Sequence, residues 1–164
     1  MTEFVFNSFF DYEDGKGARL QTRESLIPVN VYADDETDLD LQEGDLCSAE
    51  IYAIGAQDTR IFATEEDFHQ AESRLGVPCM IPMGTFSLEE DDEEFEESSH
   101  ILFVGIVNDV AVDPEAGPEE PNMLLLVETV EMELNLYIRT DRPVEKGNIV
   151  YGIAWLFGDI KKDR

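Results

Sequence analysis

The stretch NIVYGIAWLF, residues 148–157, decides the fold class of this protein. Within it, large side chains at Ile149, Tyr151, Ile153, Trp155 and Phe157 alternate with mostly small apolar ones. This period of two is typical of a β-strand. Neither face of the strand is polar, so we expect both faces to be covered, as in a closed barrel or under a cap. We therefore predict a mostly β fold.

The same period of two recurs along the rest of the chain. Gly105 indicates a sharp bend inside one long strand, as barrels need. Gly15-Lys16-Gly17 indicates a turn, because glycine adopts positive φ without strain. Residues 79–87 are expected to form an extended connector. The further predicted strands cover residues 2–10, 26–33, 44–55, 101–112, 123–127 and 132–138.

One short α-helix is predicted near residues 65–75. Thr64 is a suitable N-cap, and three acidic residues follow it in the first turn, where the helix dipole favours negative charge. Phe68 and Leu75 lie on one helical face. Gly76 supplies the stop signal at the other end.

A weak internal repeat runs through the predicted strands. Residues 43–55 resemble residues 146–158, and a Gly-Asp pair in the first segment aligns with a Gly-Asn pair in the second. With the preceding strands included, the repeat relates residues 26–56 to residues 123–158. Strand, turn and Gly-Asp are also a common β arrangement, which is the alternative explanation. We predict one domain over residues 1–164, a length that allows a real hydrophobic core.

Residues 101–158 resemble an OB-fold, the five-stranded oligonucleotide/oligosaccharide-binding barrel. The resemblance rests on a long strand containing glycine, a hairpin, and a late strand that begins after Gly-Asn and ends in aromatic-Leu-Phe-Gly. With residues 81–86 included, it extends over 81–158 and is similar to bacterial proteins of the same build. The chain departs from the pattern because no helix is predicted between Ile138 and Gly147. The resemblance implies an OB-like β-barrel, and a fold alone does not fix function.

The charge of the chain excludes some partners and favours others. The sequence has 38 acidic and 11 basic residues, a net charge of −27. Phosphate backbones are bound mainly by Lys and Arg, so we expect no non-specific binding of nucleic acid and no docking on an anionic membrane. Basic proteins and metal cations are the partners that such a field attracts.

Targeting signals are also missing from the sequence. The N-terminus has no basic region ahead of an apolar one, and no apolar stretch reaches the ~18 residues that span a bilayer. We therefore expect a cytoplasmic protein in which the thiols of Cys47 and Cys79 are reduced.

The residues that carry chemistry in enzymes form no recognisable catalytic motif here. Cys47 and Cys79 are the candidate nucleophiles, and His69 and His100 are the candidate bases. We interpret the thiols as structural and the imidazoles as surface or boundary groups. The acidic segment 34–45 does not keep the spacing of a calcium-binding loop. We expect no catalytic residue, no metal site and no cofactor.

A dense acidic run lies within the predicted loop at residues 88–99. The interpretation without a specific function is a solvated segment that raises solubility. Its functional interpretation is a docking element for a basic protein, with the phenylalanine as an apolar anchor. The candidate partner-binding residues are Glu89, Glu90, Asp91, Asp92, Glu93, Glu94, Phe95, Glu96 and Glu97.

A second candidate site consists of the aromatic residues Tyr52, Tyr137 and Trp155. These side chains are able to stack on a small neutral ligand or a saccharide, and core packing is the alternative. A third possibility is an enzyme that uses carboxylates. Our hypothesis is a non-enzymatic interaction module with an acidic surface that binds a basic protein, with the neutral ligand as the alternative.

Overall fold

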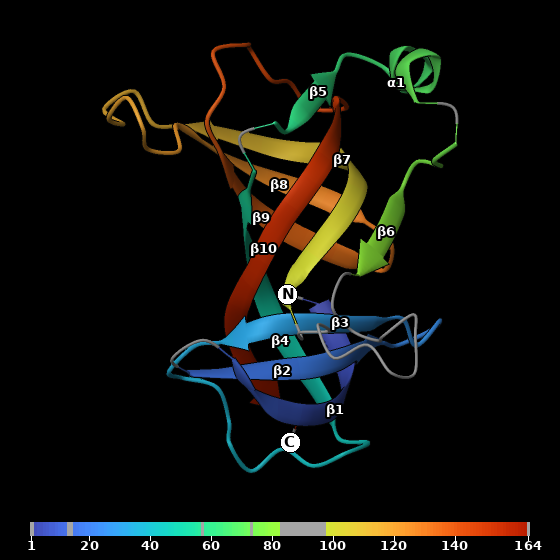
Figure 1. Ribbon diagram of the computed structural model, residues 1–164, viewed down its shortest axis with the longest axis vertical. Coiled ribbons are helices and arrows are strands. Elements are labelled where there is room, and N and C mark those ends of the chain that lie inside the picture. The colour runs from blue at the N-terminus through green and yellow to red at the C-terminus, as the bar shows by residue number, and fades with distance from the viewer. Residues whose placement is uncertain (1, 13–14, 57, 73, 83–97, 164) are drawn as a thin grey trace, which may run out of the picture. The chain divides into compact units, whose positions relative to one another are not determined.

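The computed structural model describes residues 2–12, 15–56, 58–72, 74–82 and 98–163 (Figure 1). It confirms the predicted fold class, because the described chain is mostly β with one short helix. The acidic run at 89–97 lies outside the described residues. The strands are β1 Thr2–Tyr12, β2 Gly15–Thr22, β3 Pro28–Ala33, β4 Leu46–Gly55, β5 Arg60–Phe62, β6 Cys79–Pro82, β7 His100–Val112, β8 Met123–Thr129, β9 Met132–Ile138 and β10 Ile149–Lys162, and the helix is α1 Glu65–Ala71.

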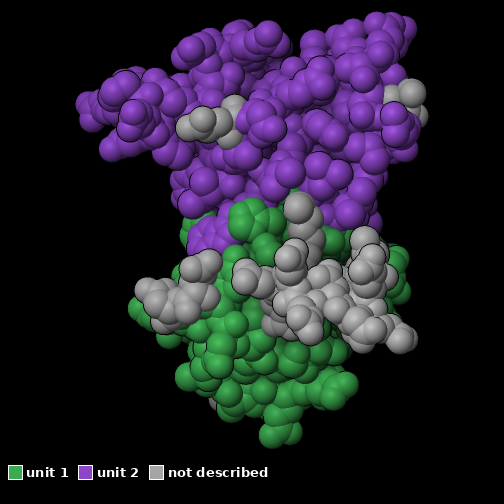
Figure 2. All heavy atoms as spheres, viewed as in Figure 1, with its two compact units in different colours: residues 1–51, 82–101, 156–164 green, residues 52–81, 102–155 purple. Residues whose placement is uncertain are grey.

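All strands belong to a single sheet. Its order is β5-β10-β3-β2-β1-β4-β9-β8-β7-β6, and β10 also pairs with β4 and β7. These additional pairings close most of the strands into a ring. The chain divides into two compact units (Figure 2). Unit 1 comprises residues 1–51, 82–101 and 156–164, and unit 2 comprises residues 52–81 and 102–155. A single domain over residues 1–164 stays a prediction.

Unit 1 contains the meander β1–β2–β3. β1 and β2 are antiparallel, as are β2 and β3, and β1 pairs on its other side with β4. The predicted turn at Gly15-Lys16-Gly17 is wrong, because these residues begin β2 and Gly17 pairs with Phe10. Few large apolar residues alternate in β2, so its pattern is faint in the sequence. The unit's fully buried large side chains include Phe4, Leu20, Val29 and Ile51.

Unit 2 contains the meander β7–β8–β9, in which neighbouring strands are again antiparallel. Its inward-facing side chains include the fully buried Phe103, Leu125 and Leu134. The predicted connector at 79–87 is a strand over Cys79–Pro82, and the described part ends there. The buried Thr129 Oγ1 donates to two carbonyl oxygens, that of Cys79 at 2.9 Å and that of Val104 at 3.1 Å. This hydroxyl therefore links β8 to β6 and β7.

The helix begins where the sequence predicts and ends earlier. The Thr64 Oγ1 accepts a hydrogen bond from the Asp67 amide at 3.1 Å, which confirms the N-cap. The predicted end at residue 75 is wrong, because the helix stops at Ala71 and Glu72 is its C-cap. Leu75 still packs on the same buried cluster as Phe68, but it does so from the segment after the helix.

The two turns that the predicted repeat aligns have the same backbone geometry. Gly44 and Gly147 have φ of +91° and +90°, values that favour glycine. Asp45 Oδ2 accepts from the Gln42 amide at 2.9 Å, and Asn148 Oδ1 accepts from the Glu145 amide at 2.8 Å. Each aligned side chain thus fixes its own turn, and a common origin of the two segments stays a prediction.

The two faces of β10 differ in burial. Within unit 2, Val150 and Ala154 are buried, whereas Tyr151, Ile153 and Trp155 are only partly buried. The expectation of two covered faces therefore holds for the face of Val150 and Ala154, and on the other face Ile149 alone of the unit 2 residues is buried. The neighbouring strand β5 was not predicted, because three residues are too few to show a period.

Several carboxylates of unit 1 gather where the acidic segment after β3 meets the end of β10. The Asp34 amide donates to the Gly158 carbonyl oxygen at 2.9 Å. Burial, together with the negative charges of Asp159 and Asp35, raises the pKa of Asp34. Asp159 Oδ1 is buried and has no hydrogen-bond partner in the described part of the chain.

Replacing Asp34 with asparagine should stabilise the protein at neutral pH. A carboxyl whose pKa is raised on folding contributes stability below its unfolded pKa, and that contribution is lost as the pH rises through the folded pKa. Ionised Asp34 thus lowers stability at pH 7. We expect D34N to raise Tm by less than about 3 °C at pH 7, with no gain near pH 3. The control D58N removes one exposed carboxylate from unit 2, and an equal gain there would indicate a net-charge effect only.

Candidate functional site

Two of the three predicted stacking residues lie together on the outer face of unit 2. Tyr52 of β4 stands between buried Ile51 and Ala53, so its ring points away from the core. Tyr137 of β9 is placed in the same way, because period-two burial also holds in β9. The two rings are stacked, with centroids 6.2 Å apart and an interplanar angle of 21°. Trp155 lies on the partly buried face of β10.

A groove of about 590 Å³ begins at Tyr137. We call it the Tyr137 groove. Ile54, at the end of β4, is 46% exposed and supplies apolar surface to the groove. Prolines from the loop between β7 and β8 supply further apolar surface. The lining residues are Ile54, Gly55, Ala56, Pro118, Glu119, Pro121, Tyr137, Ile138 and Arg139.

The loop at residues 113–122, between β7 and β8, is held in place by β9 and the residues after it. One Arg139 nitrogen, Nη1, donates to the carbonyl oxygens of Gly117 at 2.6 Å and Glu120 at 2.8 Å. The Asn122 side chain donates to the Thr140 carbonyl oxygen at 2.9 Å and accepts from the Thr140 amide at 3.0 Å. These hydrogen bonds therefore hold the loop at 113–122, which forms one wall of the groove, against Arg139 and Thr140.

The same loop carries several carboxylates, of which Glu119 lines the groove. Asp113, Glu115, Glu119 and Glu120 are all exposed. The charge of Arg139 is directed at backbone oxygens of the loop. An apolar floor beside exposed carboxylates suits a ligand that carries both an apolar group and positive charge.

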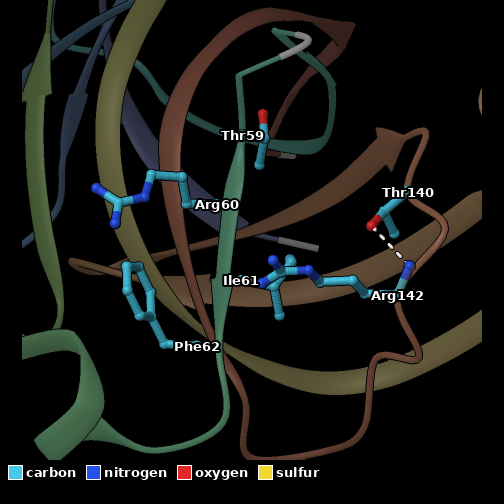
Figure 3. Close-up of a pocket in the computed structure, with 6 residues that line it drawn as sticks. All are labelled: Thr59, Arg60, Ile61, Phe62, Thr140 and Arg142. Atoms are coloured by element: carbon cyan, nitrogen blue, oxygen red, sulfur yellow. Dashed lines mark hydrogen bonds between the residues drawn. The ribbon is translucent and has the colours of Figure 1, made fainter. Parts of the chain in front are cut away.

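A second hollow of about 340 Å³ lies beside β5 (Figure 3). It is lined on one side by β5 and the residue before it, Thr59, Arg60, Ile61 and Phe62. The segment between β9 and β10 contributes Thr140 and Arg142. The Arg60 guanidinium lies over the Phe62 ring, 5.0 Å from its centroid. Among the described lining residues, the Tyr137 groove has one carboxylate, Glu119, and one guanidinium, Arg139, whereas the hollow beside β5 has two arginines.

The candidate nucleophile Cys47 is unsuited to catalysis. Its side chain is fully buried, and its Sγ is 3.7 Å from the Phe4 carbonyl oxygen. Burial, and secondarily the charges of Asp163 and Asp45, raises the pKa of Cys47 to about 12. The thiol is therefore protonated at neutral pH and does not act as a nucleophile.

The candidate bases contact other groups, and Cys79 packs against the cluster that contains Phe68. His100 Nδ1 lies 2.6 Å from Ser98 Oγ, and burial lowers the pKa of His100. His69 is exposed on α1, where its ring is 5.5 Å from the Phe68 ring. Within the described ranges, no three His, Cys, Asp or Glu side chains are grouped so that they could hold a metal ion.

Sequence reasoning thus identified the stacked tyrosines but missed the rest of the groove. The Pro-acid-acid-Pro sequence at 118–121 was the available signal, since prolines that flank carboxylates mark a rigid, charged loop. The predicted partner-binding run Glu89–Glu97 lies outside the described residues and stays a prediction.

Comparisons with protein-family models, curated proteins and solved structures found no match. In the described part of the chain, no helix has the length and apolar character needed to cross a membrane.

Proposed function

We propose that this protein is a binding module in which the Tyr137 groove takes an apolar side chain of a basic partner protein. The observation that carries the proposal is an apolar groove of about 590 Å³ bordered by an ordered acidic loop. Its volume lies in the range of sites that hold small ligands or anchoring side chains. A buried anchor supplies affinity, and the surrounding carboxylates select for positive charge.

The net charge supports the same kind of partner. A charge of −27 raises the local concentration of cationic molecules and accelerates their association. It opposes the binding of polyanions such as nucleic acid. The acidic run at 89–97 adds to this field, whatever its own role in docking.

We further propose that the strand arrangement is OB-like. In unit 1, the meander β1–β2–β3 is followed by β4, which pairs antiparallel with β1, and by β10, which pairs parallel with β3. The pairing of β10 with β4 completes a five-stranded ring. OB-folds bind ligands on strands 2 and 3 and the loop between strands 1 and 2. By analogy, β9 and the loop at 113–122 occupy these positions in the meander of unit 2, where the Tyr137 groove lies.

Tyr137→Ala should weaken the binding of a basic peptide that carries an aromatic residue. The probe is an acetylated lysine-rich pentapeptide with a central phenylalanine, titrated into isotopically labelled protein and followed by amide chemical shifts. We expect Y137A to raise Kd about three- to tenfold, because one aromatic contact is lost. The shifts should centre on Ile54, Gly55 and Arg139. Glu119→Gln should also raise Kd and reduce its dependence on salt.

The matched control is Glu66→Gln, which removes the same charge from the exposed first turn of α1 in the same unit. It should leave the pentapeptide affinity within twofold of the wild type. If E66Q and E119Q lost the same affinity for the pentapeptide, binding would depend on net charge and not on the groove. Equal affinity for a pentapeptide with central alanine would show that no apolar anchor is bound.

A small neutral ligand or saccharide is the second candidate, favoured by the stacked, partly exposed Tyr52 and Tyr137. Sugars stack on such rings through their apolar faces. A neutral glucose oligomer would then bind with an affinity that does not change with salt and would raise Tm. The two candidates are thus separated by their dependence on salt.

A further inference from the structure

The strands β7, β8 and β9 lie side by side in unit 2 (Figure 1), and their pairing fixes which side chains share the outer face. Residues directly opposite each other on neighbouring strands point to the same face of a sheet. Tyr137 of β9 is opposite Leu124 of β8, and Leu124 is opposite Ala111 of β7. Because the Tyr137 ring points away from the core, Leu124 and Ala111 do so as well. We call these three residues the first row.

Two more rows lie on the same outer face. Side chains alternate between the two faces, so every second residue of β8 and β9 belongs to this face. The second row is Asn135, Leu126 and Asp109, and the third row is Glu133, Glu128 and Ile106. Residues of β8 between the rows, such as Leu125 and Val127, are fully buried on the opposite face. The strand register thus places three rows of side chains on one surface of unit 2.

The apolar side chains of this outer face are bordered by carboxylates. Leu124 and Leu126 are only partly buried, and Tyr137 lies beside Leu124. Asp109, directly opposite Leu126, is exposed, and so is Glu128, two residues further along β8. Apolar side chains bordered by charged ones are typical of the core and rim of a protein interface. The carboxylates favour a partner that carries positive charge at this border.

The paired backbone of β8 selects the kind of segment that fits on this face. β8 pairs with β7 on one side and with β9 on the other, so a ligand here is held by side chains. An extended peptide would place its own N–H and C=O groups against apolar side chains, whereas an α-helix satisfies these groups internally. Apolar residues at i, i+4 and i+7 of a helix span about 10 Å. The distance across the sheet from β9 to β7 is also about 10 Å, two strand spacings.

We propose that this outer face, defined by Leu124, Leu126 and Tyr137, binds an amphipathic basic α-helix of the partner protein. The proposal rests on the proposed function, because the helix is the segment of the basic partner whose apolar side chain enters the Tyr137 groove. Tyr137 belongs both to the first row and to the groove lining, so the two surfaces are continuous. Apolar residues of the helix cover the two leucines, and its lysine or arginine residues face Asp109 and Glu128. The net charge of −27 favours the same helix.

The probe is an acetylated and amidated 15-residue peptide of alanine, lysine and leucine, with leucines at its positions 4, 8 and 11. It should bind saturably and shift the amides of Ala111, Leu124 and Leu126 in isotopically labelled protein. We expect Leu126→Thr to raise its Kd about three- to tenfold, because the apolar contact of the leucine is lost. Threonine favours strands, so β8 should persist. Glu128→Gln should raise the Kd about two- to fourfold at low ionic strength.

Two controls make the test specific to a helix on this face. Leu46→Thr makes the same substitution at an exposed leucine of β4 in unit 1, and it should leave the Kd of the helical peptide within twofold. An equal loss in L46T would overturn the proposal, since the effect would not belong to this face. A second peptide has the same composition with its leucines distributed around the helix. Equal affinity for that peptide would also overturn the proposal, because charge alone would then determine binding.

The phenylalanine pentapeptide separates this proposal from the proposed function. Leu126 lies one row away from Tyr137, so L126T should leave the pentapeptide affinity within twofold of the wild type, which also shows that the variant is folded. A pentapeptide that binds while the helical peptide does not would overturn the helix proposal and leave the groove. A helical peptide that shifts Leu124 and Leu126 while the pentapeptide fails to bind would support the outer face and overturn the groove as an anchor site.

Discussion

Gly105→Ala should lower the free energy of unfolding by about 1–3 kcal/mol, although it adds only one methyl group. The Cβ of alanine at this position would overlap Cγ1 of Val127 and would lie 2.9 Å from the carbonyl oxygen of Glu128. Val127 is fully buried, so its side chain has no free space to enter. The carbonyl oxygen belongs to the backbone of β8, which cannot move without disturbing its pairing with β7 and β9. Urea unfolding of both proteins measures the loss.

Two further variants make this prediction specific. Gly76→Ala is the control, because the nearest atom to its added Cβ is 3.9 Å away; its change should stay within about 0.5 kcal/mol. In the double variant G105A/V127A the overlapping methyl group is removed. We expect it to lose less stability than the sum of the single variants, since the two sites are in contact. Additive losses would show that the cost at Gly105 arises elsewhere than at Val127.

Gly105 also shows what the sequence is able to predict about this fold. A glycine inside a long apolar strand correctly indicated a special position in β7. The pattern suggested a bend there, whereas the shift in strand register lies between Val107 and Asp109. The glycine itself is needed because β8 approaches closely, and an approach of another strand leaves no local signal. The long strands were predictable because their side chains alternate, and β2 was not because few of its residues are large and apolar.

In the candidate sites too, features with a local sequence pattern were predictable and features made by distant segments were not. Tyr52 and Tyr137 could be selected because aromatic residues on strands are visible in the sequence, although their stacking depends on β4 lying next to β9. The groove depends on Arg139, which reaches carbonyl oxygens 19 and 22 residues earlier in the chain. Arg60 and Arg142 are 82 positions apart (142 − 60), so only the folded chain places them beside one hollow. Long-range contacts of this kind have no local pattern.

Phe68→Ala should have the largest effect on stability, a loss of about 3–5 kcal/mol in the free energy of unfolding. Phe68 is fully buried and forms a cluster with Val104 and Ile149. Its ring centroid lies 5.4 Å from that of Phe62 and 5.7 Å from that of Tyr151, so the variant loses two aromatic contacts as well as apolar burial. α1 has only seven residues, and Phe68 is its buried residue. A helix this short is not stable without packing, so we expect α1 to unfold along with the loss of the cluster.

The control is Gln70→Ala, two residues further along the same helix on its exposed side. Alanine favours helix more than glutamine does, so Q70A should leave stability unchanged within about 0.5 kcal/mol. Both variants are measured by urea unfolding, and hydrogen exchange of the α1 amides reports whether the helix persists. F68A should abolish protection at the amides of Phe68 and Glu72, whose hydrogen bonds close the helical turns. A loss below about 1 kcal/mol with protection retained would show that α1 does not depend on this cluster for its position.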